Sequence, residues 1–76
     1  MAKLPTDLSG QEVRAALERA GFVFRRQKGS HMVLRRDRPY ARAVVPDHKQ
    51  LRSGTLRRII LDAGLSVDEF IQLLSR

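Results

Sequence analysis

The 76-residue sequence contains no cysteine, which excludes disulfide bonds, thiolate zinc sites and thiol catalysis. It contains no run of about 20 apolar residues, so no membrane-spanning helix is predicted. The opening segment, MAKLPTDLSG, lacks the apolar stretch of an export signal, and we therefore expect a cytoplasmic protein. No linker, repeat or low-complexity segment divides the chain, which predicts a single domain over residues 1–76 with a small core.

Acidic residues are also scarce. Eight Asp and Glu face fifteen Lys and Arg, which gives a net charge of +7 and a pI of about 11.3. Such an excess indicates a polyanionic partner: nucleic acid is the first candidate, an acidic protein the second and a membrane surface the third. Twelve of the fifteen cations are arginine, whose guanidinium binds phosphate through two hydrogen bonds and stacks on bases. A preference for arginine can also follow from genome composition, so it does not by itself identify nucleic acid.

The first apolar stretch predicts a helix over about residues 10–20. Ser9 and Glu12 form the S-x-x-E pattern of a capping box, and Gly21 is placed to end the helix in the left-handed conformation. Between them, apolar residues recur at helical spacing, at Val13, Ala16, Leu17 and Ala20.

Two more helices are predicted near the C-terminus. Ser53 is the expected N-cap of the first, which Gly64 ends, and Ser66 with Glu69 forms a second capping box at the start of the other. The apolar residues at helical spacing are Leu56, Ile59, Ile60 and Ala63 in the first helix, and Val67, Phe70, Ile71 and Leu74 in the second.

The segment between the first two helices is rich in aromatic and β-branched residues and is interrupted by turn residues. This pattern predicts three short strands, at about 22–27, 31–36 and 40–45. Lys28-Gly29-Ser30 and Asp37-Arg38-Pro39 supply the turns, and such short connections require antiparallel pairing. The predicted fold class is therefore α+β in the order α-β-β-β-α-α, with a three-stranded antiparallel sheet and the helices on one of its faces.

Alternation of side chains separates the two faces of the predicted sheet. The residues expected on the core face are Phe22, Phe24, Met32 and Leu34. The residues expected to point away from the helices are Arg25, Gln27, His31 and Arg35. A β-bulge would reverse this assignment, and the third strand stays ambiguous because both of its faces are partly apolar.

In order and spacing, the sequence resembles the HicA (YcfA-like) family of toxin ribonucleases in four segments: G-F, RRQKGSHMVL, VVPDH and SGTLRRIILDAGLSVDEFIQLL. The similarity extends from about residue 9 to the C-terminus. It implies a double-stranded-RNA-binding-domain-like fold and an endoribonuclease that cleaves mRNA. We expect no cofactor, because RNA supplies its own nucleophile. It also implies a HicB-like antitoxin as the partner of the chain.

The resemblance places the family's catalytic histidine at His31, in the segment Gly29-Ser30-His31. It also matches the family's Pro-x-His pattern at Pro46-Asp47-His48. Many members carry a second histidine where this chain has Met32. Because alternation places Met32 on the core face, we do not expect catalysis to require a histidine there.

RNA carries its own nucleophile, the ribose 2′-hydroxyl, so a histidine acid/base and nearby cations are sufficient for cleavage without a metal. His31 is the candidate acid/base. The candidate RNA contacts are Arg25, Arg26, Lys28, Gly29, Ser30, Arg35, His48, Lys49 and Arg52. The role of His48 stays open between general acid, phosphate contact and loop residue, and Tyr40 either stacks on a base or packs. A basic face of this kind also predicts an acidic antitoxin that masks His31.

Three alternatives stay open. A non-catalytic module of the double-stranded-RNA-binding type would use the same charge, although SGTLRR lacks the lysine-rich start of that module's last helix. A metal nuclease would use Asp37, Asp47 and His48, whose spacing matches no known metal site. The two C-terminal helices also look like a helix-turn-helix, but Asp68 and Glu69 begin the helix that would read DNA and would oppose its phosphates.

Overall fold

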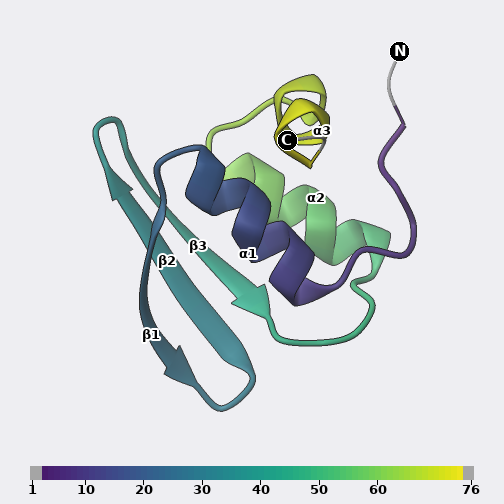
Figure 1. The fold of residues 1–76 in the computed structure, drawn as a ribbon, viewed down its shortest axis with the longest axis horizontal. Coiled ribbons are helices and arrows are strands. Elements are labelled where there is room, and N and C mark those ends of the chain that lie inside the picture. The colour runs from purple at the N-terminus through teal and green to yellow at the C-terminus, as the bar shows by residue number, and fades with distance from the viewer. Residues whose placement is uncertain (1–2, 75–76) are drawn as a thin grey trace.

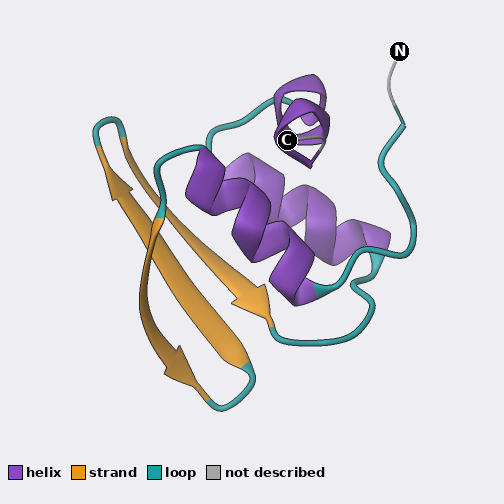
Figure 2. Ribbon diagram, in the orientation of Figure 1, coloured by secondary structure: helices purple, strands orange, loops and turns teal. Residues whose placement is uncertain are grey.

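The computed structural model describes residues 3–74 and confirms the predicted order of elements. In chain order these are α1 (Gly10–Arg19), β1 (Val23–Lys28), β2 (His31–Asp37), β3 (Tyr40–Pro46), α2 (Ser53–Asp62) and α3 (Val67–Leu74). The strands form one antiparallel sheet in the order β1-β2-β3 (Figure 1). The helices lie on one side of this sheet, and α3 packs beside α1 (Figure 2). The chain therefore has the expected α+β, double-stranded-RNA-binding-domain-like architecture. None of the described helices is long and apolar enough to cross a membrane.

Capping interactions fix where the helices begin. The Ser9 hydroxyl accepts a hydrogen bond from the Glu12 backbone N–H at 3.1 Å, and the Glu12 carboxylate accepts one from the Ser9 backbone N–H at 3.0 Å. Ser66 and Glu69 make the same pair of bonds at the start of α3, so both predicted capping boxes are confirmed. The prediction that Ser53 caps α2 is wrong. Ser53 is the first helical residue, and the N-cap is Arg52, whose side chain makes no capping bond.

The second capping box also lowers the pKa of Glu69. Hydrogen bonds with the backbone and then the side chain of Ser66, together with a weaker attraction from Arg36, hold the pKa of Glu69 below its ordinary value of 4.5. The ionised carboxylate is therefore the form that stabilises the first turn of α3.

The core lies between the helices and the inner face of the sheet. Its most deeply buried large side chains are Val13, Leu17, Met32, Leu34, Val45, Leu56 and Phe70. Of the four predicted core residues, three are buried and Phe24 is partly exposed. Strand register resolves the ambiguity of β3, because Ala43 lies opposite Leu34 and Val45 lies opposite Met32. The alternate residues of β3 therefore face away from the helices.

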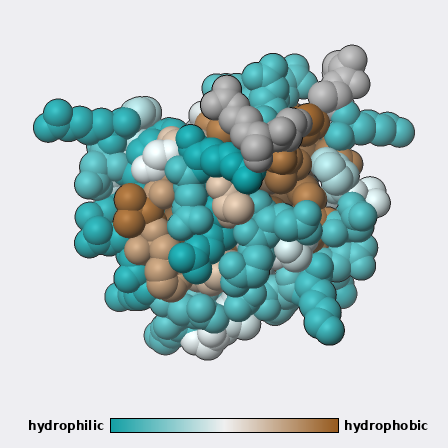
Figure 3. Space-filling model, in the orientation of Figure 1, coloured by the Kyte–Doolittle hydropathy of each residue, from teal (hydrophilic) through white to brown (hydrophobic). Residues whose placement is uncertain are grey.

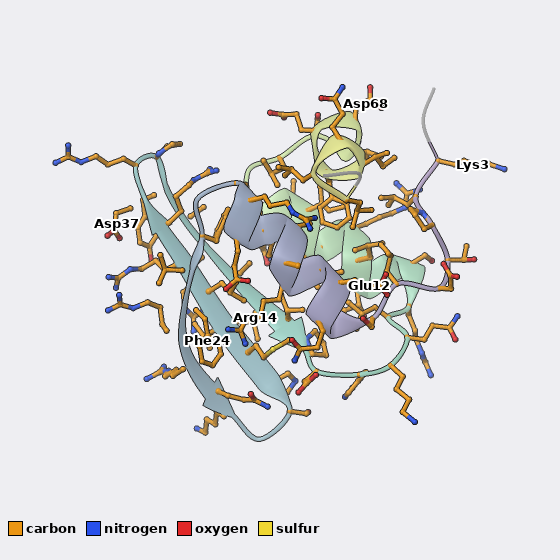
Figure 4. The ribbon with its side chains drawn as sticks, viewed as in Figure 1. Lys3, Glu12, Arg14, Phe24, Asp37 and Asp68 are labelled. Atoms are coloured by element: carbon orange, nitrogen blue, oxygen red, sulfur yellow. The ribbon has the colours of Figure 1, made fainter. Side chains whose placement is uncertain are left out.

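Arginines close the edges of this core. Arg14 of α1 lies over the ring of Phe24, with its guanidinium carbon 4.1 Å from the ring centre (Figure 4). Arg36 of β2 lies over the ring of Phe22 at 4.7 Å. In Figure 3, which has the orientation of Figure 1, hydrophilic residues cover most of the visible surface, with smaller hydrophobic patches between them. Arg14 and Arg36 therefore cover apolar surface of the protein itself, so this part of the arginine excess is not available to bind a partner.

Arg36 also joins the ends of two helices. Its guanidinium donates hydrogen bonds to the Ala20 carbonyl at the end of α1 and to the Ala63 carbonyl at the end of α2, both at 3.3 Å. A third bond, at 3.1 Å, reaches the Pro39 carbonyl in the turn before β3. Carbonyl groups at a helix C-terminus lack partners within the helix and carry partial negative charge, which a cation stabilises.

Candidate nucleic-acid interface

A β-bulge in β1 determines which cations reach the outer face of the sheet. Phe24 pairs with Leu34 and Arg26 pairs with Val33, so Arg25 is an extra residue in β1. Beyond the bulge the alternation is reversed, and Arg26 and Lys28 lie opposite Val33 and His31 on the face away from the helices. Arg25 lines a hollow on the same face together with Arg26.

The bulge contradicts one predicted position. Alternation predicts Gln27 on the outer face, but Gln27 pairs with Met32, whose side chain is fully buried. The Gln27 amide donates hydrogen bonds to the Gly29 carbonyl at 3.1 Å and to the Asp47 carboxylate at 3.5 Å. Gln27 therefore helps to hold the loop after β3 and is not part of the outer face.

His31 lies at a tight hairpin turn. Lys28 and His31 are paired across the strands, so Gly29 and Ser30 form a two-residue loop. Gly29 has a φ of +58° and Ser30 does not have a positive φ, which is the pattern of a type II′ turn. This turn places His31 at the start of β2, where its side chain is exposed as predicted. The Ser30 carbonyl accepts a hydrogen bond from the Asp47 N–H at 2.6 Å, which ties the turn to the end of β3.

His31 lies in a hollow lined by cations. The other lining residues are Arg26, Lys28, Val33, Arg42 and Val44. No carboxylate is among these lining residues, and within residues 3–74 none of the three cations forms an ion pair. Three unpaired positive charges beside an exposed imidazole form a site that attracts phosphate.

A second hollow adjoins the first on the same face. It is lined by Arg25, Arg26, Val33, Arg35, Tyr40 and Arg42. Three of these residues, Arg26, Val33 and Arg42, also line the hollow around His31. We call the combined surface the basic face and define it by Arg25, Arg26, Lys28, His31, Arg35, Tyr40 and Arg42. Nitrogen-tipped side chains project from this side of the sheet in Figure 4, where Asp37 also points away from the helices.

Asp37 has little effect on the charge of the basic face. It is the only acid at the outward positions of the three described strands, and it forms an ion pair with Arg35 at 3.0 Å. This pair is largely exposed, so solvent and salt weaken it. The remaining cations of the face are free to bind an external anion.

The loop after β3 carries the other predicted contacts. His48, Lys49 and Arg52 are exposed, and none of them lines either hollow. The backbone of the loop is well fixed, because the His48 carbonyl accepts a hydrogen bond from Gly10 at 2.9 Å and Leu51 donates one to the Leu8 carbonyl at 2.8 Å. Contact of these three side chains with RNA stays a prediction, as does a role of His48 in acid catalysis.

The residues of the metal alternative are not brought together. Asp37 lies where β2 turns into β3, whereas Asp47 and His48 follow the opposite end of β3. Within residues 3–74, no three His, Asp or Glu side chains are grouped closely enough to hold a metal ion.

Arg42 was absent from the predicted site. Alternation in the third strand groups it with Tyr40 and Val44, but alternation alone could not show which face of that strand is buried. The register with β2 decides this, because Arg42 lies opposite Arg35 and Val44 lies opposite Val33.

Comparison with known proteins identifies the family to which the chain belongs. Over residues 10–65, the sequence matches the family model described as "HicA toxin of bacterial toxin-antitoxin". The match includes the whole sheet, the His31 turn and the loop after β3. A search of curated proteins found no match. Because the matched segment covers well over half of the chain, the protein belongs to the HicA family of toxins of bacterial toxin–antitoxin systems.

Proposed function

We propose that this toxin is a metal-independent endoribonuclease that cleaves mRNA in the cytoplasm, with residues 1–76 acting as one domain and His31 as its acid/base residue. The observation that supports this most directly is the position of His31, which is exposed in a hollow with three unpaired cations. An exposed imidazole can exchange protons with a substrate, and the cations can hold the phosphate next to it.

In the proposed reaction, His31 accepts the proton of the ribose 2′-hydroxyl as its oxygen attacks the adjacent phosphorus. The bond from phosphorus to the 5′-oxygen of the next nucleotide breaks, and that oxygen takes a proton from water or from a second acid, for which His48 is the candidate. The products are a 2′,3′-cyclic phosphate and a 5′-hydroxyl. Arg26, Lys28 and Arg42 are the cations that can stabilise the negative charge on the phosphate oxygens. DNA lacks the nucleophile and should resist cleavage.

The toxin–antitoxin family implies an antitoxin partner, and we propose that it is acidic and similar to HicB. The basic face provides complementary charge for such a protein. An antitoxin bound across His31 would block the access of RNA.

The experiment compares the cleavage of single-stranded RNA by the parent protein and by His31→Ala and His48→Ala variants. Circular dichroism establishes that each variant is folded. We expect His31→Ala to lower the rate by about 10²- to 10⁴-fold, the usual contribution of a general acid or base. A folded His48→Ala protein that cleaves as fast as the parent would exclude the second histidine as the acid. Cleavage should persist in EDTA, and the products should carry 2′,3′-cyclic phosphate ends.

A folded His31→Ala protein that cleaves as fast as the parent would refute the catalytic assignment. The alternative function, a non-catalytic RNA-binding module, is supported by the same basic face. It would be favoured if the parent bound duplex RNA strongly and gave no cleavage product.

A further inference from the structure

The basic face contains an aromatic ring that the proposed reaction does not use. The chain has three Phe, one Tyr and no Trp. Arg36 and Arg14 cover the rings of Phe22 and Phe24, and Phe70 is fully buried. Tyr40 differs, because it is 68% exposed and no cation lies over its ring within residues 3–74. Among the Phe and Tyr residues that the structure describes, it is therefore the one whose ring an external group can stack on.

The surroundings of Tyr40 are those of a nucleic-acid site. It shares a hollow with Arg25, Arg26, Arg35 and Arg42, and that hollow is continuous with the one around His31. Sites for single-stranded nucleic acids combine a cationic groove that follows the backbone with aromatic rings that stack on bases. A basic face with an exposed ring at one end has both components.

We infer that Tyr40 forms a base-stacking subsite for single-stranded RNA, away from the scissile phosphate, and that the strand reaches it from His31 by crossing the outer face of the sheet. This inference rests on the proposed function, because it takes RNA as the ligand of the basic face. Arg26 and Arg42, which line both hollows, would bind the phosphates between the two ends.

The sheet register gives the length of this path. Tyr40 pairs with Asp37, which is six residues from His31 along β2. At about 3.3 Å per residue, the two sites are roughly 20 Å apart. Six nucleotides stacked at about 3.4 Å each would cover that distance, and an extended strand would need fewer. Tyr40 therefore contributes to binding, while the chemistry takes place at His31.

A single strand fits this subsite better than a duplex. The faces of paired bases are covered by their neighbours in the stack, so a duplex offers the sheet only its phosphates and groove edges. The Tyr40 ring can therefore stack only on an unpaired base, whose face is exposed. The aromatic contribution should therefore appear with single-stranded RNA and be missing with a duplex.

An acidic protein is the competing occupant of Tyr40, since tyrosine and arginine are also common in protein interfaces. RNA is favoured because the same cationic surface is continuous with the proposed catalytic histidine. Weaker binding of the antitoxin to Tyr40→Ala, without any loss of RNA affinity, would overturn the inference.

The test measures binding without cleavage. The probe is a fluorescein-labelled single-stranded RNA of about 12 nucleotides, within the usual range of single-strand sites, with 2′-O-methyl groups that remove the nucleophile. Its affinity is measured by fluorescence anisotropy for the parent, Tyr40→Ala, Tyr40→Phe and Leu61→Ala. Leu61 on α2 is the matched control, because it is equally exposed at 68% and lies outside the basic face. A duplex of the same length is measured in parallel.

We expect Tyr40→Ala to weaken single-strand binding by at least about fivefold, the lower end for loss of one stacked base, and to change duplex binding by less than about twofold. Tyr40→Phe keeps the ring and should retain the affinity, as should Leu61→Ala. Because the chain has one Tyr and no Trp, its ultraviolet emission reports on Tyr40 directly. The unlabelled single strand should quench this emission, after correction for absorption by RNA, more than the duplex does.

Unchanged single-strand affinity in Tyr40→Ala would overturn the inference. An equal loss of affinity for the single strand and the duplex would also overturn it, because it would indicate a general change in the face. Neither result depends on cleavage, so failure of this inference can be told apart from failure of the catalytic assignment to His31.

Discussion

Arg35 and Arg36 are neighbours in β2 but lie on opposite faces of the sheet, so replacing each by alanine should have different consequences. Arg36 donates hydrogen bonds to the ends of α1 and α2 and covers Phe22. The Arg35 side chain is 38% exposed, and within residues 3–74 its ion pair is with Asp37. Arg36→Ala is therefore expected to destabilise the fold. Arg35→Ala is expected to affect binding of RNA.

The cost of removing Arg36 can be estimated from its contacts. Each charge-assisted bond to a helix end contributes about 1 kcal/mol at these rather long distances, and the ring contact adds about 0.5–1 kcal/mol. The total is about 2–3 kcal/mol, which lowers the melting temperature of a domain of this size by about 10–20 °C. Arg36→Lys should recover part of this loss, because an ammonium group keeps the charge but cannot bind carbonyl groups in the same planar geometry.

The assay is thermal unfolding followed by circular dichroism, together with RNA binding measured as a function of salt. Arg35→Ala should change the free energy of unfolding by less than about 1 kcal/mol, because its ion pair is exposed. For single-stranded RNA, the slope of the logarithm of the binding constant against the logarithm of salt concentration should become shallower by about 0.7. This is the value for one lost phosphate contact. Equal melting temperatures for Arg36→Ala and the parent would refute the role assigned to Arg36. Strong destabilisation by Arg35→Ala would refute the assignment of faces.

Two further predictions concern the helix starts. A Cβ at Gly10 would collide with the Pro46 carbonyl oxygen, so Gly10→Ala should lower the free energy of unfolding by about 1–3 kcal/mol. A Cβ at Gly54 would meet nothing within 4 Å, so the control Gly54→Ala should be neutral or slightly stabilising. Similar effects of both substitutions would contradict the close packing of α1 on the end of β3. The lowered pKa of Glu69 predicts a pH dependence, because a carboxyl with a depressed folded pKa stabilises the fold when ionised. The difference in melting temperature between the parent and Glu69→Gln should be largest above pH 4.5 and should disappear as the pH falls through the lowered pKa of Glu69. A difference in melting temperature that persists in acid would refute the cause given for the lowered pKa.

Local patterns in the sequence were sufficient for most of the fold. The capping boxes at Ser9 and Ser66 depend on residues three positions apart, so they can be identified without tertiary information. The outward position of His31 follows from alternation within one strand, and the structure confirms it. The capping prediction at Ser53 failed because a serine before an apolar stripe does not show which residue begins the helix.

Features that depend on contacts between distant segments could not be predicted. The register of β3 against β2 determines that Arg42 joins the site. The role of Arg36 depends on the positions of two helix ends that lie far from it in sequence. Among twelve arginines, no local pattern distinguishes one that caps helices from one that faces a ligand. Such assignments require the assembled sheet.

The bulge at Arg25 shows how such a feature determines the composition of the site. With regular pairing, β1 would present Arg25 and Gln27 on the outer face and would direct Arg26 and Lys28 toward the helices. One extra residue brings Arg26 and Lys28 to the face of His31, beside Arg25. It also turns Gln27 to the inner side, where its amide binds the Asp47 carboxylate and helps to hold the loop after the sheet. A single irregularity of the backbone therefore raises the number of cations that β1 contributes to the basic face and supports the loop that carries the second histidine.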